Sequence, residues 1–245
     1  LFYEVFMKQI KCSNCGEENS FLNQKCKKCG GFIQQRVPNL NLFETMIEVL
    51  EKPSVRFHKI CLSEQKNYIF LLFSFTGFSL LFALYSFTSF GRLYSNLLYL
   101  LLPSLVFGPL LGIFNLSLFS YFSFFITGKI LKGESTLRNI RAIIAYSLIP
   151  IVLATLFVLP TELIIFGMYL FTNAPSPAVY KPIPYYILIS LDVISVIYSL
   201  FLFYKGLKVA NNFNELKTFY GFIILLIIFS TIFYLQIIII QSFLK

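Results

Sequence analysis

The membrane topology depends on residues 93–128, which read LYSNLLYLLLPSLVFGPLLGIFNLSLFSYFSFFITG. No residue in this stretch is charged. As one helix it would be about 54 Å long at 1.5 Å per residue, well beyond the roughly 30 Å hydrocarbon core of a bilayer. Pro103 and the pair Gly108-Pro109 interrupt it. Two alternatives follow: an interfacial or re-entrant piece over 93–104 before a span at 105–127, or two short spans.

Apolar runs on both sides of this stretch predict an all-α polytopic membrane protein. The predicted spans cover residues 68–90, 105–127, 140–160, 185–204 and 218–243, within a membrane domain over 68–245. Residues 163–172 are too few to cross, so with the proline-rich segment 173–184 they are predicted as an outer interfacial hairpin. Hydrophobic residues make up 57% of the chain and charged residues 13%, against roughly 25% charged in a typical soluble domain. This composition excludes an ordinary cytosolic enzyme, a disordered chain and a secreted disulfide scaffold.

The positions of the basic residues predict the orientation. Two loops carry most of them, at Lys129, Lys132, Arg138, Arg141, Lys205, Lys208 and Lys217. Because cytoplasmic loops are enriched in Lys and Arg, five spans put both basic loops and the amino terminus in the cytoplasm and the carboxyl terminus outside. A sixth span inside 93–128 would separate the loops from the amino terminus. The basic residues alternate with long apolar runs and form no dense stripe, so no nucleic-acid partner is expected.

Four cysteines predict a zinc ribbon over residues 8–36. Cys12 and Cys15 form one pair, Cys26 and Cys29 form another, and each second cysteine is followed by glycine. Zinc takes four thiolates in a tetrahedron, and a two-residue spacer lets both sulfurs of a tight turn reach one ion. Two disulfides or an iron–sulfur cluster are the rivals, but reduced cytosolic thiols and paired knuckles favour zinc. Four protein ligands leave no open position, so the zinc is predicted to be structural.

Between the ribbon and the first span, residues 37–67 are predicted as a linker and an amphipathic lead-in helix. Apolar residues recur at near-helical spacing over residues 40–50, with glutamates between them, and the helix is expected to end at Pro53. Its polar face is acidic and would gain nothing from anionic lipid, so we expect the helix to pack against protein.

The first residues of the chain are set aside. Met7-Lys8 look like a natural start, so residues 1–6 are expected to be a misplaced start or a vector remnant. No signal peptide is evident, because its apolar part would be too short and would carry Glu4 and Lys8.

Three stretches carry a family resemblance. Residues 42–60 contain a lead-in helix followed by a Pro, Phe, Ile pattern. Residues 128–150 contain a basic glycine-rich loop followed by a Tyr-Ser and Pro signature. Residues 198–208 form the end of the fourth span. In this order they resemble the Yip family, the Ypt/Rab-interacting five-span membrane proteins, in a prokaryotic form with an added zinc ribbon. The resemblance implies five helices and a cytosolic amino-terminal region. The ribbon and the Phe, Ile, Asn and Lys bias suggest a bacterial cytoplasmic membrane.

Asp192 is the one acid inside a predicted span and heads a candidate intramembrane polar site with Tyr146, Ser147 and Pro150. An acid at bilayer depth is costly and is by default a functional hypothesis. The alternative is a strut that hydrogen-bonds Ser190, Ser195, Tyr198 or a hydroxyl on a neighbouring helix. Pro150 either frees a carbonyl near Tyr146 for a polar partner or only kinks the helix.

Three other residues or motifs have simpler interpretations. Glu162 is expected to be solvated at the outer interface, and His58 is expected to be interfacial. Gly108 and Gly112 form a GxxxG motif, which permits close helix packing.

The predicted function is a membrane adaptor or scaffold, in which the ribbon and basic loops dock a cytosolic protein partner. The bilayer is the second partner, and a homo-oligomer stays open. The alternative is a small transporter or channel with Asp192 in the path, although five spans cannot form two equal inverted repeats. An enzyme is not predicted, because the chain has one histidine, no P-loop and no glycine-rich dinucleotide turn.

Overall fold

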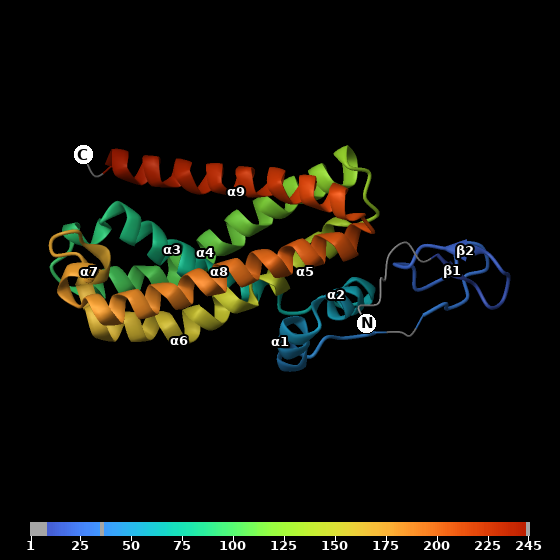
Figure 1. The fold of residues 1–245 in the computed structure, drawn as a ribbon, viewed down its shortest axis with the longest axis horizontal. Helices are drawn as coiled ribbons and strands as arrows, with labels where there is room; N and C mark the ends of the chain where they lie inside the picture. Colours follow the sequence, from blue (N-terminus) through green and yellow to red (C-terminus); the bar gives the residue numbers. More distant parts are fainter. Residues whose placement is uncertain (1–8, 35–36, 244–245) are drawn as a thin grey trace. The chain divides into compact units, whose positions relative to one another are not determined.

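Five helical segments in the computed structural model are long and apolar enough to cross a membrane (Figure 1). They are Ile69–Thr88, Leu97–Ile130, Leu137–Phe171, Pro182–Asn211 and Glu215–Ser242. The structure describes residues 9–34 and 37–243, so residues 1–6, the expected start remnant, lie outside the described residues. The all-α polytopic fold is confirmed.

The chain divides into two compact units, and the division runs through several helices. The first unit comprises Leu1–Ile69, Ser120–Tyr146 and Leu202–Ile223. The second comprises Phe70–Phe119, Ser147–Phe201 and Ile224–Lys245. The first unit therefore holds the cysteine cluster and both basic loops.

The amino-terminal module is built from two small hairpins. Strands β1 (Ile10–Lys11) and β2 (Glu18–Asn19) pair antiparallel around the first cysteine pair. An isolated bridge between Lys25 and Phe32 closes the second hairpin around the second pair. Each cysteine pair thus lies in the turn of its own hairpin.

Two short helices follow the ribbon, where the sequence predicts one. Helix α1 (Leu42–Glu51) begins at Asn41, whose side chain accepts the Glu44 N–H, and α2 (Pro53–Leu62) begins at Pro53. Proline suits the first helical position because that residue needs no hydrogen-bonded N–H, so Pro53 ends one helix and starts the next. Arg56 of α2 is buried and reaches back to α1, where its guanidinium lies 2.7 Å from the Glu48 carboxylate. This ion pair fastens α1 to α2, so α1 packs partly against protein.

Helix α3 (Ile69–Thr88) crosses α4 (Leu97–Phe124) at three glycines of the second unit. A Cβ on Gly77 of α3 would lie 2.6 Å from the backbone nitrogen of Gly112 and still closer to the carbonyl oxygen of Gly108. The two backbones therefore touch directly. The GxxxG pair of α4 serves packing within the chain.

Helix α4 differs from both alternatives that the sequence suggests for residues 93–128. The 3-10 turn η1 (Phe90–Leu93) precedes it, and α4 runs without a break through Pro103 and Pro109 into the π-helical η2 (Phe125–Ile130). A proline removes one backbone hydrogen bond, whereas ending a helix in lipid would expose several backbone groups. One long helix is therefore favoured over a break.

The third membrane segment is also longer than expected. It consists of α5 (Leu137–Ser147), α6 (Ile149–Phe166) and the 3-10 turn η3 (Gly167–Phe171), with a break at Leu148. Pro150 lies in the first turn of α6, so it follows this break and does not kink a helix. The helix continues through Pro160, so most of the predicted outer hairpin over residues 163–172 belongs to α6 and η3.

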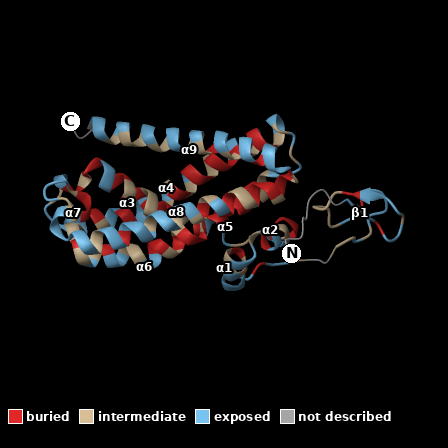
Figure 2. Ribbon diagram, in the orientation of Figure 1, coloured by how far each residue is buried: buried red, intermediate tan, exposed pale blue. Residues whose placement is uncertain are grey.

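Three helices complete the chain, and the last is the least covered. They are α7 (Pro177–Tyr180), α8 (Pro182–Asn211) and α9 (Glu215–Phe243). Only 6% of the most apolar 18-residue stretch of α9 is buried, and most residues of α9 are exposed or half-buried (Figure 2). Within the second unit its Gln236 side chain donates to Asn115 Oδ1 of α4 at 2.8 Å. Such an exposed apolar surface is suited to lipid contact.

Candidate functional site

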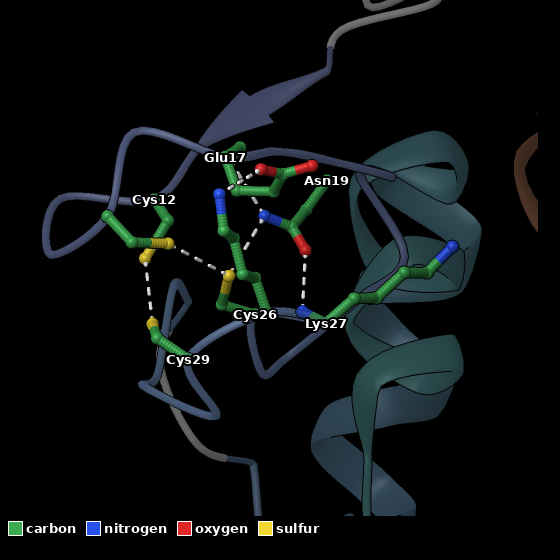
Figure 3. Close-up of polar contacts among 8 residues, drawn as sticks. Cys12, Glu17, Asn19, Cys26, Lys27 and Cys29 are labelled. Atoms are coloured by element: carbon green, nitrogen blue, oxygen red, sulfur yellow. Dashed lines mark hydrogen bonds and ion pairs between the residues drawn. The ribbon is translucent and has the colours of Figure 1, made fainter.

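The four cysteine thiols converge on one point (Figure 3). Their sulfur atoms all lie within 4.8 Å of one another, with 3.5 Å between Cys12 and Cys29 and 3.5 Å between Cys15 and Cys26. A tetrahedral zinc site with 2.3 Å bonds has sulfur atoms about 3.8 Å apart. Spacing and donor type therefore fit a metal ion held by four thiolates, and Zn²⁺ suits such a set.

The two cysteine knuckles have the same backbone geometry. In the first, Cys12 N–H donates to Glu17 O at 2.9 Å, and in the second, Cys26 N–H donates to Gly31 O at 2.8 Å. Each knuckle closes on a glycine N–H that donates to the carbonyl of its first cysteine, from Gly16 at 2.9 Å and from Gly30 at 3.0 Å.

The two glycines have φ values of 70° and 73°. Only glycine adopts these values without strain, and this explains the glycine after each second cysteine.

Hydrogen bonds prepare two of the thiols for deprotonation. The backbone N–H of Cys29 is the main cause that lowers the pKa of Cys26 to about 6. The backbone N–H of Cys15 likewise lowers the pKa of Cys12. The Glu17 N–H favours the Cys15 thiolate, but burial and the other three thiols outweigh it and raise the pKa of Cys15 to about 12. Neighbouring thiolates repel one another, and a bound cation would relieve that repulsion.

Asn19 connects the two knuckles, and the sequence analysis missed it. Its side chain is buried, donates to Cys26 Sγ at 3.4 Å and to Glu17 O at 2.9 Å, and accepts the Lys27 N–H at 2.9 Å. Figure 3 shows the amide of Asn19 between Cys26 and Lys27. No spacing rule marks this asparagine, so only the folded chain identifies it.

The basic residues predicted to form docking loops all lie in the first unit, but they differ in exposure. Lys129, Lys132, Arg138 and Lys217 are exposed, whereas Arg141 and Lys205 are half-buried. Lys208 is buried and forms an ion pair with Glu215.

Two of the arginines are engaged within the unit. Arg138 donates to Glu64 O at 2.6 Å, and the guanidinium of Arg141 lies 4.9 Å from the centre of the Tyr121 ring. The exposed lysines are therefore the residues best placed to meet a partner.

The candidate intramembrane polar residues fall in both units. Tyr146 belongs to the first unit, where its hydroxyl donates to Asn67 O at 2.8 Å. Ser147, Pro150 and Asp192 belong to the second unit, and Ser147 is buried. Tyr146 thus holds the start of α3.

Asp192 of α8 lies near Glu162 of α6 within the second unit. The two carboxyl groups are close enough to interact electrostatically, and Glu162 is buried. The expectation that Glu162 is solvated was wrong, because α6 continues past Pro160 and turns Glu162 inward. The hydroxyls of Ser190 and Ser195 donate to carbonyls of their own helix, at Ile187 and Leu191.

His58 lies against the ribbon. Its ring stacks on Phe21 with 3.7 Å between ring centres and 23° between planes, and its Nε2 lies 3.1 Å from Phe21 O. Burial lowers the pKa of His58 despite that hydrogen bond. The only histidine thus contacts the module that carries the cysteines.

A family model described as the Yip1 domain matches residues 47–236. This range runs from within α1 to within α9 and leaves the cysteine cluster before its start. Neither the curated proteins nor the solved structures gave a match.

Proposed function

Because this chain belongs to the Yip1 domain family, we propose that it is a membrane adaptor that presents its amino-terminal ribbon to a protein partner. The ribbon covers residues 8–36, the lead-in segment 37–67, and the five-span domain 68–245. The observation that carries the proposal is the four-thiol cluster, which lies outside the range of the family match. A small module added in front of a membrane domain is suited to presenting a docking surface.

The ribbon holds Zn²⁺ through Cys12, Cys15, Cys26 and Cys29, and the ion is structural. Four thiolates fill a tetrahedral site, so no position stays open for a substrate or water. Bound zinc supplies the cross-link that this short segment needs in order to fold. The residues of the chain do the rest: Asn19 and the knuckle N–H groups orient the sulfurs and offset their charge.

The ribbon and the exposed lysines face the cytoplasm of a bacterial cell. The grouping of the cysteine cluster and both basic loops in one unit supports this orientation, since Lys and Arg are retained on the cytoplasmic side. The carboxyl terminus then lies outside. Lys129, Lys132 and Lys217 are exposed in the same unit as the ribbon and provide positive charge for a protein partner. The basic residues of the chain form no dense stripe, so no nucleic acid is expected.

A crosslinking pull-down from native membranes tests the adaptor function. It compares the natural chain with the Cys12→Ser/Cys15→Ser variant at equal membrane abundance. We expect a partner that only the natural chain captures. Capture of the same proteins by both chains would contradict a docking role for the ribbon.

The Glu162–Asp192 pair supports a second candidate, a small transporter or channel. A carboxyl pair between two membrane helices is typical of proton relays. In liposomes, Asp192→Asn would abolish proton or solute flux under this function, while the cysteine variant would keep it. Equal flux from the natural chain and from empty liposomes would exclude it.

A further inference from the structure

The segment between the two cysteine knuckles is the part of the ribbon that touches the rest of the first unit. Phe21 stacks on His58 of α2 at 3.7 Å between ring centres, and its carbonyl accepts from His58 Nε2 at 3.1 Å. Gln24 donates to Leu62 O at the end of α2, and the Ser20 hydroxyl bonds the Glu134 carboxylate. Three neighbouring ribbon residues therefore reach α2 and the loop after α4. We call residues 20–24 the docking segment.

The conformation of the docking segment depends on the knuckles at its two ends. From the ribbon side, Gln34 Nε2 donates to Phe21 O at 2.6 Å, and Ile33 N–H donates to Gln24 O at 2.9 Å. Asn19 precedes the segment and binds Cys26 and Lys27, which follow it. Among residues 9–34 only Cys12, Asn19 and Cys26 are buried, so no apolar core holds these contacts together. The metal must supply the missing stability.

We propose that metal binding by the ribbon and docking of residues 20–24 on α2 are thermodynamically coupled. Bound metal holds the two knuckles in one conformation, the knuckles hold Phe21 in position, and Phe21 stacks on the ring of His58. Because thermodynamic coupling is reciprocal, docking on α2 must strengthen metal binding by the same factor by which bound metal strengthens docking. The ribbon is then a metal-dependent clamp, by which we mean that it binds α2, the helix before the first span, when metal is bound. Loss of the metal releases the ribbon from α2. This inference rests on the proposed metal site but not on any partner.

A histidine on α2 gives the sharpest test, because it lies outside the ribbon and is not one of the four cysteines that would hold the metal. The full chain in lipid nanodiscs is titrated with Zn²⁺ against a chromophoric chelator, as the natural chain and as His58→Ala. We expect His58→Ala to weaken Zn²⁺ binding about fivefold or more, within the range common for coupled sites. His58→Phe keeps a ring for stacking and should recover most of that loss.

Two phenylalanines of the ribbon provide a matched pair of variants. Phe21→Ala removes the stack and should weaken Zn²⁺ binding as His58→Ala does. Phe32 is 54% exposed and forms a cation–π contact with Lys25 of the ribbon, so Phe32→Ala should leave the affinity unchanged. Equal losses for both variants would mean that any ribbon truncation weakens the site, and would overturn the coupling.

Hydrogen exchange over residues 53–62 gives a second, independent measurement. Chelation of the metal should speed exchange in α2 of the natural chain and should have no such effect in His58→Ala, where the clamp is already lost. If the natural chain binds no Zn²⁺, both the metal site and the clamp fail. If it binds Zn²⁺ with the same affinity as His58→Ala, the clamp alone fails and the adaptor proposal stands.

Discussion

The ribbon and the helix crossing of the second unit are held together in opposite ways. In the ribbon, the buried residues among 9–34 are two cysteines and Asn19, and hydrogen bonds to sulfur and backbone replace an apolar core. Where α3 meets α4, Gly77, Gly108 and Gly112 bring two backbones into direct contact. Four thiols that could hold an ion thus stand where the chain has too few residues for an apolar core. Close backbone packing stands where lipid removes the hydrophobic driving force between helices.

We expect the largest effect from replacing cysteine ligands of the ribbon. Cys12→Ser/Cys15→Ser removes two of four ligands and most of a binding free energy of about 10–16 kcal/mol for structural zinc sites. We expect loss of bound metal, rapid hydrogen exchange over residues 9–34 and faster exchange in α2, while the membrane-spanning helices keep their protection. Metal analysis and exchange mass spectrometry measure both. A variant that retains one metal ion per chain would contradict the four-thiolate site.

The next effect tests the helix crossing. Gly77→Ala would place a methyl group against the backbone of α4, and overpacking of this kind costs about 1–3 kcal/mol. We expect Gly77→Ala to lower the free energy of unfolding in a detergent titration by about that amount. Gly128→Ala is the matched control, because the nearest atom to its added carbon is a Phe124 ring atom at 3.4 Å. Equal stability of the two variants would show that the crossing tolerates a wider separation.

We expect a smaller effect from removing the side-chain hydrogen bond to sulfur. Asn19→Ala removes a donor to Cys26 and an acceptor for Lys27 N–H, and such losses beyond the ligands cost about 10–100-fold in metal affinity. We expect a loss near the lower end, measured by competition with a chelator. Asn14→Ala is the control, since Asn14 is exposed and its contribution to Cys12 comes from its backbone N–H. An unchanged affinity in Asn19→Ala would mean that the ligands alone set the site.

The smallest effect concerns the pH dependence of the docking of residues 20–24 on α2. Burial lowers the pKa of His58 from its ordinary value of 6.5, so the undocked form binds a proton more readily than the docked form. Docking is therefore unaffected above pH 6.5 and weakens as pH falls below it, until the docked histidine also titrates. Hydrogen exchange over residues 20–24 at pH 5.5 and 7.5 should show this difference. His58→Phe controls for proton competition at the thiols, and an equal pH response in both chains would remove His58 from the effect.

Local patterns were predictable from the sequence, and contacts between distant residues were not. The spacing of Cys12, Cys15, Cys26 and Cys29 is a local rule, and the structure places their thiols together. The apolar runs likewise predicted five membrane helices, because helix length in lipid follows from composition alone.

The breaks inside the membrane segments were harder to predict. Pro103 and Pro160 are strong helix breakers in water, but both helices continue past them, since lipid offers freed backbone groups no partner. The prediction that Glu162 is solvated was wrong for the same reason, since Glu162 is buried within α6, which continues past Pro160. The contacts of Asn19 and His58 require folded partners and leave no trace in spacing.

The burial of Lys208 offers a way to map sidedness by chemistry. An amine-reactive reagent that cannot cross membranes would modify Lys129, Lys132 and Lys217, which are exposed, but spare Lys208 in its ion pair with Glu215. Lys181 is exposed in the other unit and labels independently. Comparing whole cells with opened vesicles would then read the orientation from the natural chain without inserted tags. The protected lysine serves as an internal standard, since its modification would report unfolding.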